Sequence, residues 1–187
     1  MEDLTLKIKE AIIQKENIDE LVWMIKDALI HQKERALGMA NEALDLLKLI
    51  DSLRGSVPSI AFGCKLGGSV ALALQGLSLP RPLHDVDVII AKDQFRALHR
   101  FVSNTILFRL CPGYSVGVHS QFSFQVAGSD LIFNILEGNP DMYKMVSDNK
   151  GLIKVEPVER ILEIKEQYGR LKDIEDIKFC KLFLDTE

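Results

Sequence analysis

The apolar residues in the first third of the chain recur every three or four positions. The pattern covers residues 4–14, and a second stretch with the same spacing begins after Asn17 and ends near Gly55. This spacing lines up apolar side chains on one face of an α-helix. Asn17 followed by Glu20 is a capping-box pattern, so Asn17 marks the start of the second stretch. We predict a helix of ~50 Å there, at about 1.5 Å per residue, either continuous or divided in two at Gly38.

Shorter apolar runs take over in the middle of the chain. Residues 59–63 and 85–90 are mostly apolar and as short as buried strands. Residues 122–126 alternate between apolar and polar, and residues 131–136 return after a turn that contains Gly128, which predicts a hairpin. Further helices are expected over 69–74, 93–103, 157–168 and from 171 onward. Further strands are expected over 105–110 and, at a sheet edge, over 152–155. A short helical or irregular piece is expected from 140. This mixture predicts an α/β (α+β) fold.

Length and composition limit what the chain can be. With 187 residues, 47% of them apolar, it suits one domain with an appendage or two small ones. We place a helical arm at residues 1–55 and a second unit at residues 56–187. The net charge of −4 makes no general case for nucleic-acid binding.

Apolar runs, the first residues and the cysteines indicate the cellular location of the protein. No apolar run approaches the ~20 residues of a membrane span, and the first residues lack the basic-then-apolar order of a signal peptide. Three widely spaced cysteines without metal-ligand spacing are typical of free thiols in a reducing compartment. We therefore expect a cytoplasmic protein with no membrane partner.

Residues 67–69, Gly-Gly-Ser, are the first candidate for chemistry. Two glycines can adopt backbone angles barred to other residues and leave room for a ligand. The small, helix-forming residues that follow predict that a helix begins at this pair. Backbone N–H groups at a helix start, together with the Ser69 hydroxyl, suit a phosphate. The alternative for this segment alone is an ordinary turn.

Asp85 and Asp87 are the second candidate. Residues two apart on a strand point to the same face, so the two carboxylates are expected to stand side by side and to need a cation. Paired carboxylates beside a phosphate site describe a Mg²⁺–nucleotide site. The alternative for this pair alone is an edge strand with a solvated face. The pieces in this order, from strand through Gly-Gly-Ser and helix to Asp-x-Asp, are rarer than either piece by itself.

This stretch resembles the nucleotidyltransferases of the polymerase β-like superfamily, especially the small prokaryotic members and their toxin-like relatives. Those proteins have a Gly-Gly or Gly-Ser pair at a helix start and an Asp-x-Asp or Asp-x-Glu on the next strand. The matching residues here are Gly67, Gly68, Ser69, Asp85 and Asp87, with Gly76, Arg81 and His84 in the loop between them. The resemblance implies a mixed-sheet nucleotidyltransferase core between the N-terminal helical arm and C-terminal helices. It also implies Mg²⁺ held by the two aspartates, and a nucleoside triphosphate whose phosphates lie against the Gly-Gly-Ser segment.

In the resembled family a third carboxylate on the returning strand completes the site. The matching residue here is Asn134, which can lend a carbonyl oxygen to a metal but cannot act as a base. Glu137 has the opposite strand parity, whereas Asp130 has the right parity and would supply the carboxylate if the strand began earlier than predicted. On the favoured register, nucleotide binding survives this departure better than catalysis does.

The C-terminal segment resembles the same family through a Lys-x4-Arg-x-Lys-Asp-x-x-Asp pattern that begins at Lys165. Lys165 and Lys172 could reach a triphosphate, where a point charge is enough. The alternative for Lys165 is a solvated helix face. Asp173 and Asp176 are expected to be a helix-start charge and a partner for arginine rather than metal ligands.

These residues favour Mg²⁺-dependent transfer of a nucleotidyl group from a nucleoside triphosphate to an acceptor hydroxyl on a protein, an RNA or a small molecule. One alternative is a degenerate binding module that keeps the metal–nucleotide site, with Asn134 as its signature. Another is a partner-binding protein whose function lies in the helical arm. That arm is expected to cover one face of the core, or to pair two copies as a homodimer.

Overall fold

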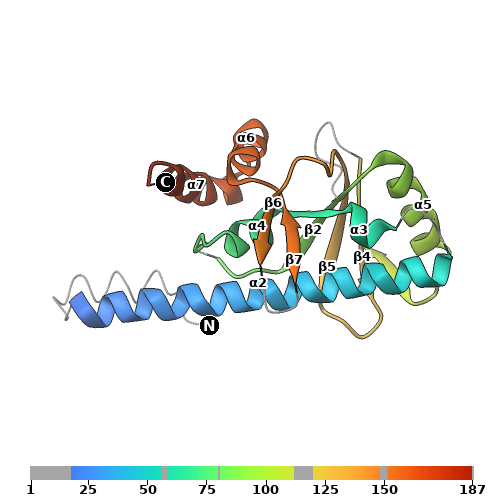
Figure 1. Ribbon diagram of the computed structural model, residues 1–187, viewed down its shortest axis with the longest axis horizontal. Coiled ribbons are helices and arrows are strands. Elements are labelled where there is room, and N and C mark those ends of the chain that lie inside the picture. The colour runs from blue at the N-terminus through green and yellow to red at the C-terminus, as the bar shows by residue number, and fades with distance from the viewer. Residues whose placement is uncertain (1–17, 56–58, 80, 112–119, 148–150, 187) are drawn as a thin grey trace.

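The computed structural model describes residues 18–55, 59–79, 81–111, 120–147 and 151–186, with side chains from Ile30 onward except that of Lys172 (Figure 1). The helix expected over 4–14 and the cap expected at Asn17 lie outside these residues. The helices are α2 (Ile18–Arg54), α3 (Ile60–Gly63), α4 (Gly68–Leu74), α5 (Lys92–Ser103), α6 (Val158–Tyr168) and α7 (Ile174–Leu184), with a 3-10 turn η1 (Leu171–Asp173). The strands are β1 (Lys65–Gly67), β2 (Asp85–Ile90), β3 (Phe108–Cys111), β4 (Gln121–Val126), β5 (Ile132–Glu137), β6 (Lys144–Ser147) and β7 (Leu152–Val155).

Helix α2 is a single helix of 37 residues that runs the length of the molecule (Figure 1). It continues through Gly38, so the continuous alternative is correct and the division at Gly38 is wrong. The helix ends at Gly55, whose φ of +59° terminates it in the left-handed region. Its buried stripe is made of small and aliphatic residues, namely Ala36, Ala40, Ala43, Leu47 and Ile50. Among the described helices, none combines the length and apolar character that crossing a membrane requires.

The segment expected as a strand over 59–63 is instead a short helix, α3. The Ser59 hydroxyl accepts a hydrogen bond from the backbone N–H of Phe62, which caps the helix. Asp51 on α2 reinforces this cap, because its Oδ2 accepts from Ser59 Oγ at 2.7 Å and from the N–H of Ala61 at 2.9 Å. The strand prediction was wrong because a carboxylate from another helix satisfies these donors, which local periodicity does not reveal.

The seven strands form one mixed sheet in the order β3-β4-β5-β2-β1-β7-β6. Strand β2 lies at its centre, antiparallel to β1 and parallel to β5. The predicted hairpin of β4 and β5 is confirmed. Strand β7 lies between β1 and β6 rather than at an edge, so that expectation was wrong. The edge belongs to β6, which was not predicted because its residues are mostly exposed and show no apolar alternation.

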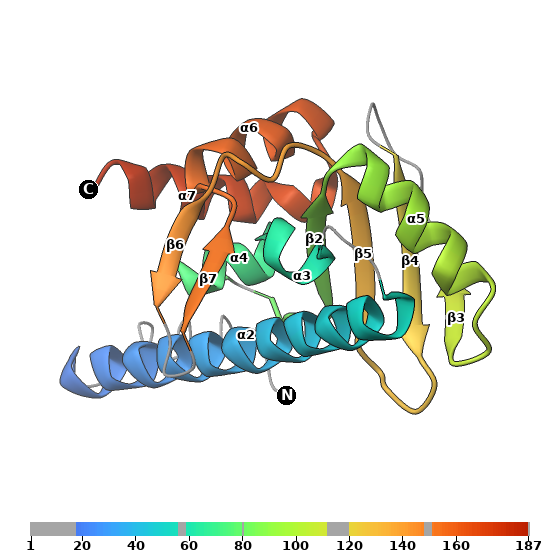
Figure 2. The same cartoon turned by 45° about the vertical axis from the view of Figure 1, so that its right-hand side comes forward.

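The two faces of this sheet differ in character. One face carries the core, including Phe124 stacked on Phe133 with ring centroids 5.3 Å apart. Helix α5 covers β4 there, through an edge-on contact of Phe95 with Phe122 at 5.2 Å (Figure 2). Because side chains alternate along a strand, Ser123, between these phenylalanines on β4, points to the opposite face. The candidate chemistry lies on that opposite face.

Candidate functional site

A row of polar side chains crosses the three central strands on this face. In the sheet register Asp87 on β2 is opposite Asn134 on β5, and Asn134 is opposite Ser123 on β4. The Asn134 Nδ2 donates to Asp85 Oδ2 at 2.7 Å and to Asp87 Oδ1 at 3.0 Å. Ser123 Oγ donates to Asn134 Oδ1 at 2.7 Å. The structure thus brings together three of the sequence-predicted residues, Asp85, Asp87 and Asn134, and Ser123 is an addition that the sequence analysis missed.

The Gly-Gly-Ser segment lies directly beside this row. Gly67 is paired with Asp87 across β1 and β2, and α4 begins at Gly68, as predicted. Gly68 has a φ of +59°, and a Cβ built on it would lie 1.8 Å from Asp87 Oδ2. Only glycine fits here, because a side chain would collide with the carboxylate and strain the backbone. Asp85 and Asp87 therefore share one strand face, as predicted, and Asp87 lies against the Gly67–Ser69 turn.

Among the described residues, no third carboxylate joins Asp85 and Asp87 in the row. Strand β5 begins at Ile132, so Asp130 lies in the exposed turn before it and does not occupy the alternative position. In the described part of the chain, no three His, Cys, Asp or Glu side chains are grouped so that they could hold a metal. The Asn134 amide presents its nitrogen, not its oxygen, to the two aspartates. Its two N–H groups therefore offset part of the repulsion between the carboxylates.

A second group of charged side chains adjoins Ser69 and is called the C-terminal ion cluster below. Its members are Arg81, Lys165, Arg170, Asp173 and Asp176. Lys165 Nζ contacts Asp173 Oδ1 at 2.6 Å and Asp176 Oδ2 at 2.8 Å. Arg81 Nη2 donates to Ser69 Oγ at 2.6 Å and to Asp176 Oδ2 at 2.8 Å, and Arg170 Nε donates to Asp173. Arg81 therefore connects the Gly-Gly-Ser helix start to the C-terminal helices.

Pairing controls protonation in this cluster. Burial by itself would raise the pKa of Asp173, but hydrogen bonds from Arg170 and Lys165, and their charges, outweigh it and hold that pKa below its ordinary value. Burial would lower the pKa of Arg81, but the hydrogen bond and charge of Asp176 outweigh it and raise that pKa. The charge of Asp85 acts in the same direction, which links the cluster to the carboxylate row.

This cluster changes the interpretation of the C-terminal pattern. Asp173 and Asp176 are fully buried partners of basic side chains, as expected. Lys165 is also buried, so the solvated-face alternative was wrong, and its ammonium group is bound to two carboxylates. A phosphate-binding role for Lys165 stays a prediction. The side chain of Lys172 lies outside the described residues, so its phosphate-binding role also stays a prediction.

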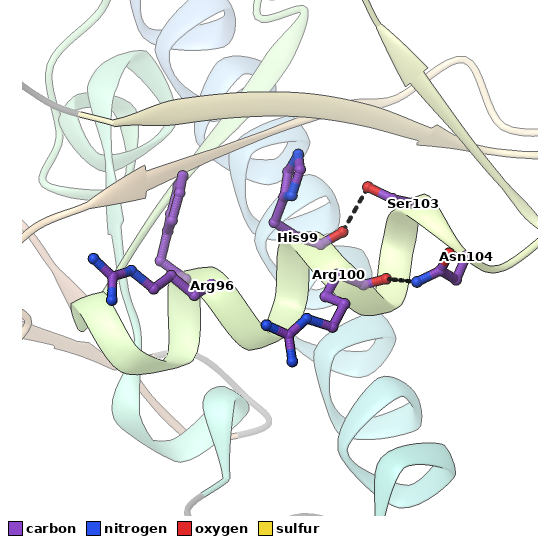
Figure 3. Close-up of a pocket in the computed structure, with 6 residues that line it drawn as sticks. Arg96, His99, Arg100, Ser103 and Asn104 are labelled. Carbon is purple, nitrogen blue, oxygen red and sulfur yellow. Dashed lines mark hydrogen bonds between the residues drawn. The ribbon is translucent and has the colours of Figure 1, made fainter.

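A separate pocket lies along α5 and includes no residue of the carboxylate row. It has a volume of about 400 Å³ and is lined by Phe95, Arg96, His99, Arg100, Ser103 and Asn104 (Figure 3). Ser103 Oγ and Asn104 Nδ2 donate to the backbone carbonyls of His99 and Arg100, so these polar groups already serve the helix end. All six lining residues come from one short stretch of chain. The sequence analysis did not select any of them.

Comparison with known proteins gives structural neighbours only. No family model matches the chain, and no curated protein matches it either. A Thermotoga maritima protein, provisionally assigned as a nucleotidyltransferase, is 19% identical, with coverage of 79% of this chain and 95% of the other and a TM-score of 0.44. The antibiotic-resistance factor ANT(2'')-Ia, in complex with adenylyl-2''-tobramycin, is 14% identical. The match covers 83% of this chain and 87% of the other, with a TM-score of 0.46. The solution structure of ANT(2'')-Ia is 15% identical. That match covers 83% of this chain and 82% of the other, with a TM-score of 0.43.

The predicted class of protein therefore recurs among the structural neighbours. Because the identities are below 20% and the TM-scores below 0.5, the function of this chain is inferred from its own residues.

Proposed function

We propose that this protein transfers a nucleotidyl group from a nucleoside triphosphate to an acceptor hydroxyl, with Mg²⁺ held by Asp85 and Asp87. One observation carries the proposal. The two carboxylates share a strand face and lie against a glycine turn in which Gly68 leaves no room for any side chain. A core strand gains nothing from such a pair, since two adjacent carboxylates repel each other. Their arrangement is the one that a cation and a phosphate need.

The residues fit a magnesium ion. Mg²⁺ is usually bound in proteins by one or two carboxylates plus water and substrate phosphate oxygens. Asp85 and Asp87 are half-buried, so part of each side chain is accessible to solvent. When bound, the ion would neutralise charge that develops on the transferring phosphoryl group.

The other residues of the site orient the participants. Asn134, fixed by Ser123, holds both carboxylates in one direction. The Ser69 hydroxyl, at the start of α4, would bind one oxygen of the triphosphate. Catalysis would consist mostly of positioning and charge neutralisation. The acceptor, whether protein, RNA or small molecule, stays open, and we keep the cytoplasm as the proposed setting.

The amide of Asn134 also supports a second candidate, a nucleotide-binding module without turnover. A general base usually contributes ~10²- to 10⁴-fold in rate, and an asparagine cannot supply one. With its nitrogen directed at both aspartates, Asn134 offers no negative charge for a second metal ion. Such a protein would bind a Mg²⁺–nucleotide and release it unchanged.

Calorimetric titration with each nucleoside triphosphate and Mg²⁺ tests the shared part of both candidates. Wild-type protein should bind, Asp87→Asn should lose the Mg²⁺-dependent binding, and Asp130→Asn, in the exposed turn, should retain it. Incubation with labelled triphosphates, RNA and cell-extract protein then separates enzyme from binding module. Failure of the wild type to bind any nucleotide would leave a partner-binding function of the helical arm as the remaining candidate.

A further inference from the structure

A triphosphate beside two carboxylates needs positive charge, and the helix start provides little. Helix α4 has only seven residues, and the summed dipole of so short a helix is small. A side-chain cation must therefore do most of the work. Among the described residues, Lys65 on β1 is buried and bound to Glu156 and the Met142 carbonyl, whereas the C-terminal ion cluster contacts Ser69 directly through Arg81.

Lys165 is poorly suited to this task. Its side chain is only 5% exposed, and its ammonium group is already bound by two fully buried carboxylates. To reach a phosphate, Lys165 would have to leave Asp173 and Asp176 at a high cost, because a buried charge without a partner is strongly destabilising. Its position is explained by the carboxylates that it neutralises.

Arg81 is the better suited cation. It lies between α4 and β2, with 28% of its side chain exposed, and one terminal nitrogen holds both Ser69 Oγ and Asp176 Oδ2. Its Nε is buried and has no hydrogen-bond partner among the described residues. A guanidinium offers five N–H donors in a planar fork that matches phosphate oxygens. One terminal nitrogen of this fork is thus fixed in place, and the exposed part of the side chain is the part that a phosphate could meet.

The charges of the cluster agree with this assignment. Three basic side chains face two carboxylates, so the cluster has one positive charge in excess. Lys165 and Arg170 both neutralise Asp173, and Lys165 also shares Asp176 with Arg81. The excess favours an anion beside the cluster, and Arg81 is the member that contacts the glycine turn through Ser69.

We propose that Arg81 is the residue that binds the polyphosphate of the nucleotide, with Asp176 as its positioning residue and Lys165 as the structural cation that holds Asp176. This inference rests on the proposed function for the identity of the ligand, but the anion site can be tested without it. A purely structural Arg81, one that only ties the loop to α7, is the competing explanation. It predicts no preference for the number of phosphates.

The test compares three ligands with wild-type protein and Arg81→Gln. The ligands are ATP with Mg²⁺, AMP with Mg²⁺, and inorganic tripolyphosphate, each titrated calorimetrically. A charge-assisted hydrogen bond to phosphate is worth enough to weaken affinity about ten- to a hundredfold when it is lost. Arg81→Gln should weaken ATP and tripolyphosphate binding by that factor and change AMP binding less than about twofold. Arg96→Gln on α5 is the matched control and should change neither.

Arg81→Lys keeps the charge and guards against misfolding of the glutamine variant. It should retain part of the tripolyphosphate affinity, because an ammonium group binds phosphate as a point charge. Equal loss of ATP and AMP binding in Arg81→Gln, or no loss for ATP and tripolyphosphate, would overturn the inference while leaving nucleotide binding in place. Arg81-dependent binding of tripolyphosphate without any binding of ATP would support the anion site and overturn the proposed function. Wild-type protein that binds none of the three would overturn both.

Discussion

The arginine near the carboxylate row and the arginines on α5 differ in how they are held. Arg81, in the loop before β2, is held by Ser69 and Asp176, and the carboxylate row is held by Asn134. On the α5 surface, Arg96 and Arg100 line a pocket, yet neither guanidinium has a hydrogen-bond or ion-pair partner in the part of the chain that the structure describes. Positioning of side chains before a ligand arrives lowers the entropic cost of binding. We therefore place the proposed site at the residues that are held in position rather than in the α5 pocket.

Removal of Lys165, the cation that holds the C-terminal ion cluster together, should have the largest effect on stability. Lys165→Met leaves two buried carboxylates short of a partner, so the free energy of unfolding should fall by about 3–5 kcal/mol. Lys181→Met, which removes an exposed pair with Glu166, should cost no more than about 1 kcal/mol. Urea denaturation of both variants measures the difference. Equal effects would show that Lys165 does not hold the cluster together.

The glycine turn offers the next largest effect. Gly68→Ala combines the strain of a left-handed residue with a collision against Asp87. Gly55 has the same φ of +59° but open space around its Cβ position, so Gly55→Ala isolates the backbone cost of roughly 1–2 kcal/mol. We expect Gly68→Ala to lose about 1–3 kcal/mol more, the usual cost of overpacking. Thermal or chemical unfolding of the two variants provides the measurement, and no excess for Gly68→Ala would show that Asp87 moves aside freely.

Asn134→Asp tests what the Asn134 amide does between Asp85 and Asp87 in the carboxylate row. It replaces two N–H donors with a third carboxylate, so without metal the variant should lose about 1.5–3 kcal/mol of stability, as when a hydrogen bond to a charged group is lost. Millimolar Mg²⁺ should restore most of this loss in the variant and change the wild type much less. We also expect the added carboxylate to raise turnover in the label-transfer assay. Robust wild-type transfer that the substitution lowers would show that Asn134 is no defect and would remove the binding-module alternative.

Acid should loosen the polar face gradually. The pKa of Asp173 is lowered in the folded protein, so its contribution to stability is present above its unfolded pKa and is lost as the pH falls through its folded pKa. The stability difference between wild type and Asp173→Asn should therefore shrink steadily as the pH falls below the ordinary pKa range of an aspartate. This effect is smaller than loss of Lys165, because protonated Asp173 still accepts hydrogen bonds. Denaturation curves across that range give the slope, and a difference that grew towards acid would contradict the assignment.

The α5 surface should respond least. Arg96→Gln and Arg100→Gln remove exposed groups without described partners, so each should change stability by no more than about 0.5 kcal/mol. Neither should alter nucleotide binding, since α5 covers the opposite face of the sheet. Denaturation and calorimetry of the double variant check both statements. A loss of nucleotide affinity in that variant would move the ligand to the α5 pocket.

Several features of this fold were predictable because they depend on residues close together in the sequence. Apolar spacing predicts α2 and its end at Gly55, and alternation predicts β4 and the return of β5. The two-residue spacing of Asp85 and Asp87 places both carboxylates on one face, and the parity of Asn134 places it opposite them. Each of these follows from the repeat of a helix or a strand alone.

Other features were decided only by tertiary structure. Asp51 on α2 turned the expected strand at 59–63 into a helix, and pairing with both β1 and β6 moved β7 away from the edge. Arg81 and Asp176 are 95 positions apart, and only the packing of α7 brings them together. No local pattern distinguishes a lysine on a solvated helix face from Lys165, which is buried between two carboxylates. Local sequence patterns were enough to indicate which residues could form the site. The fold decided which charged side chains are paired and which are exposed, because burial and pairing depend on partners distant along the chain.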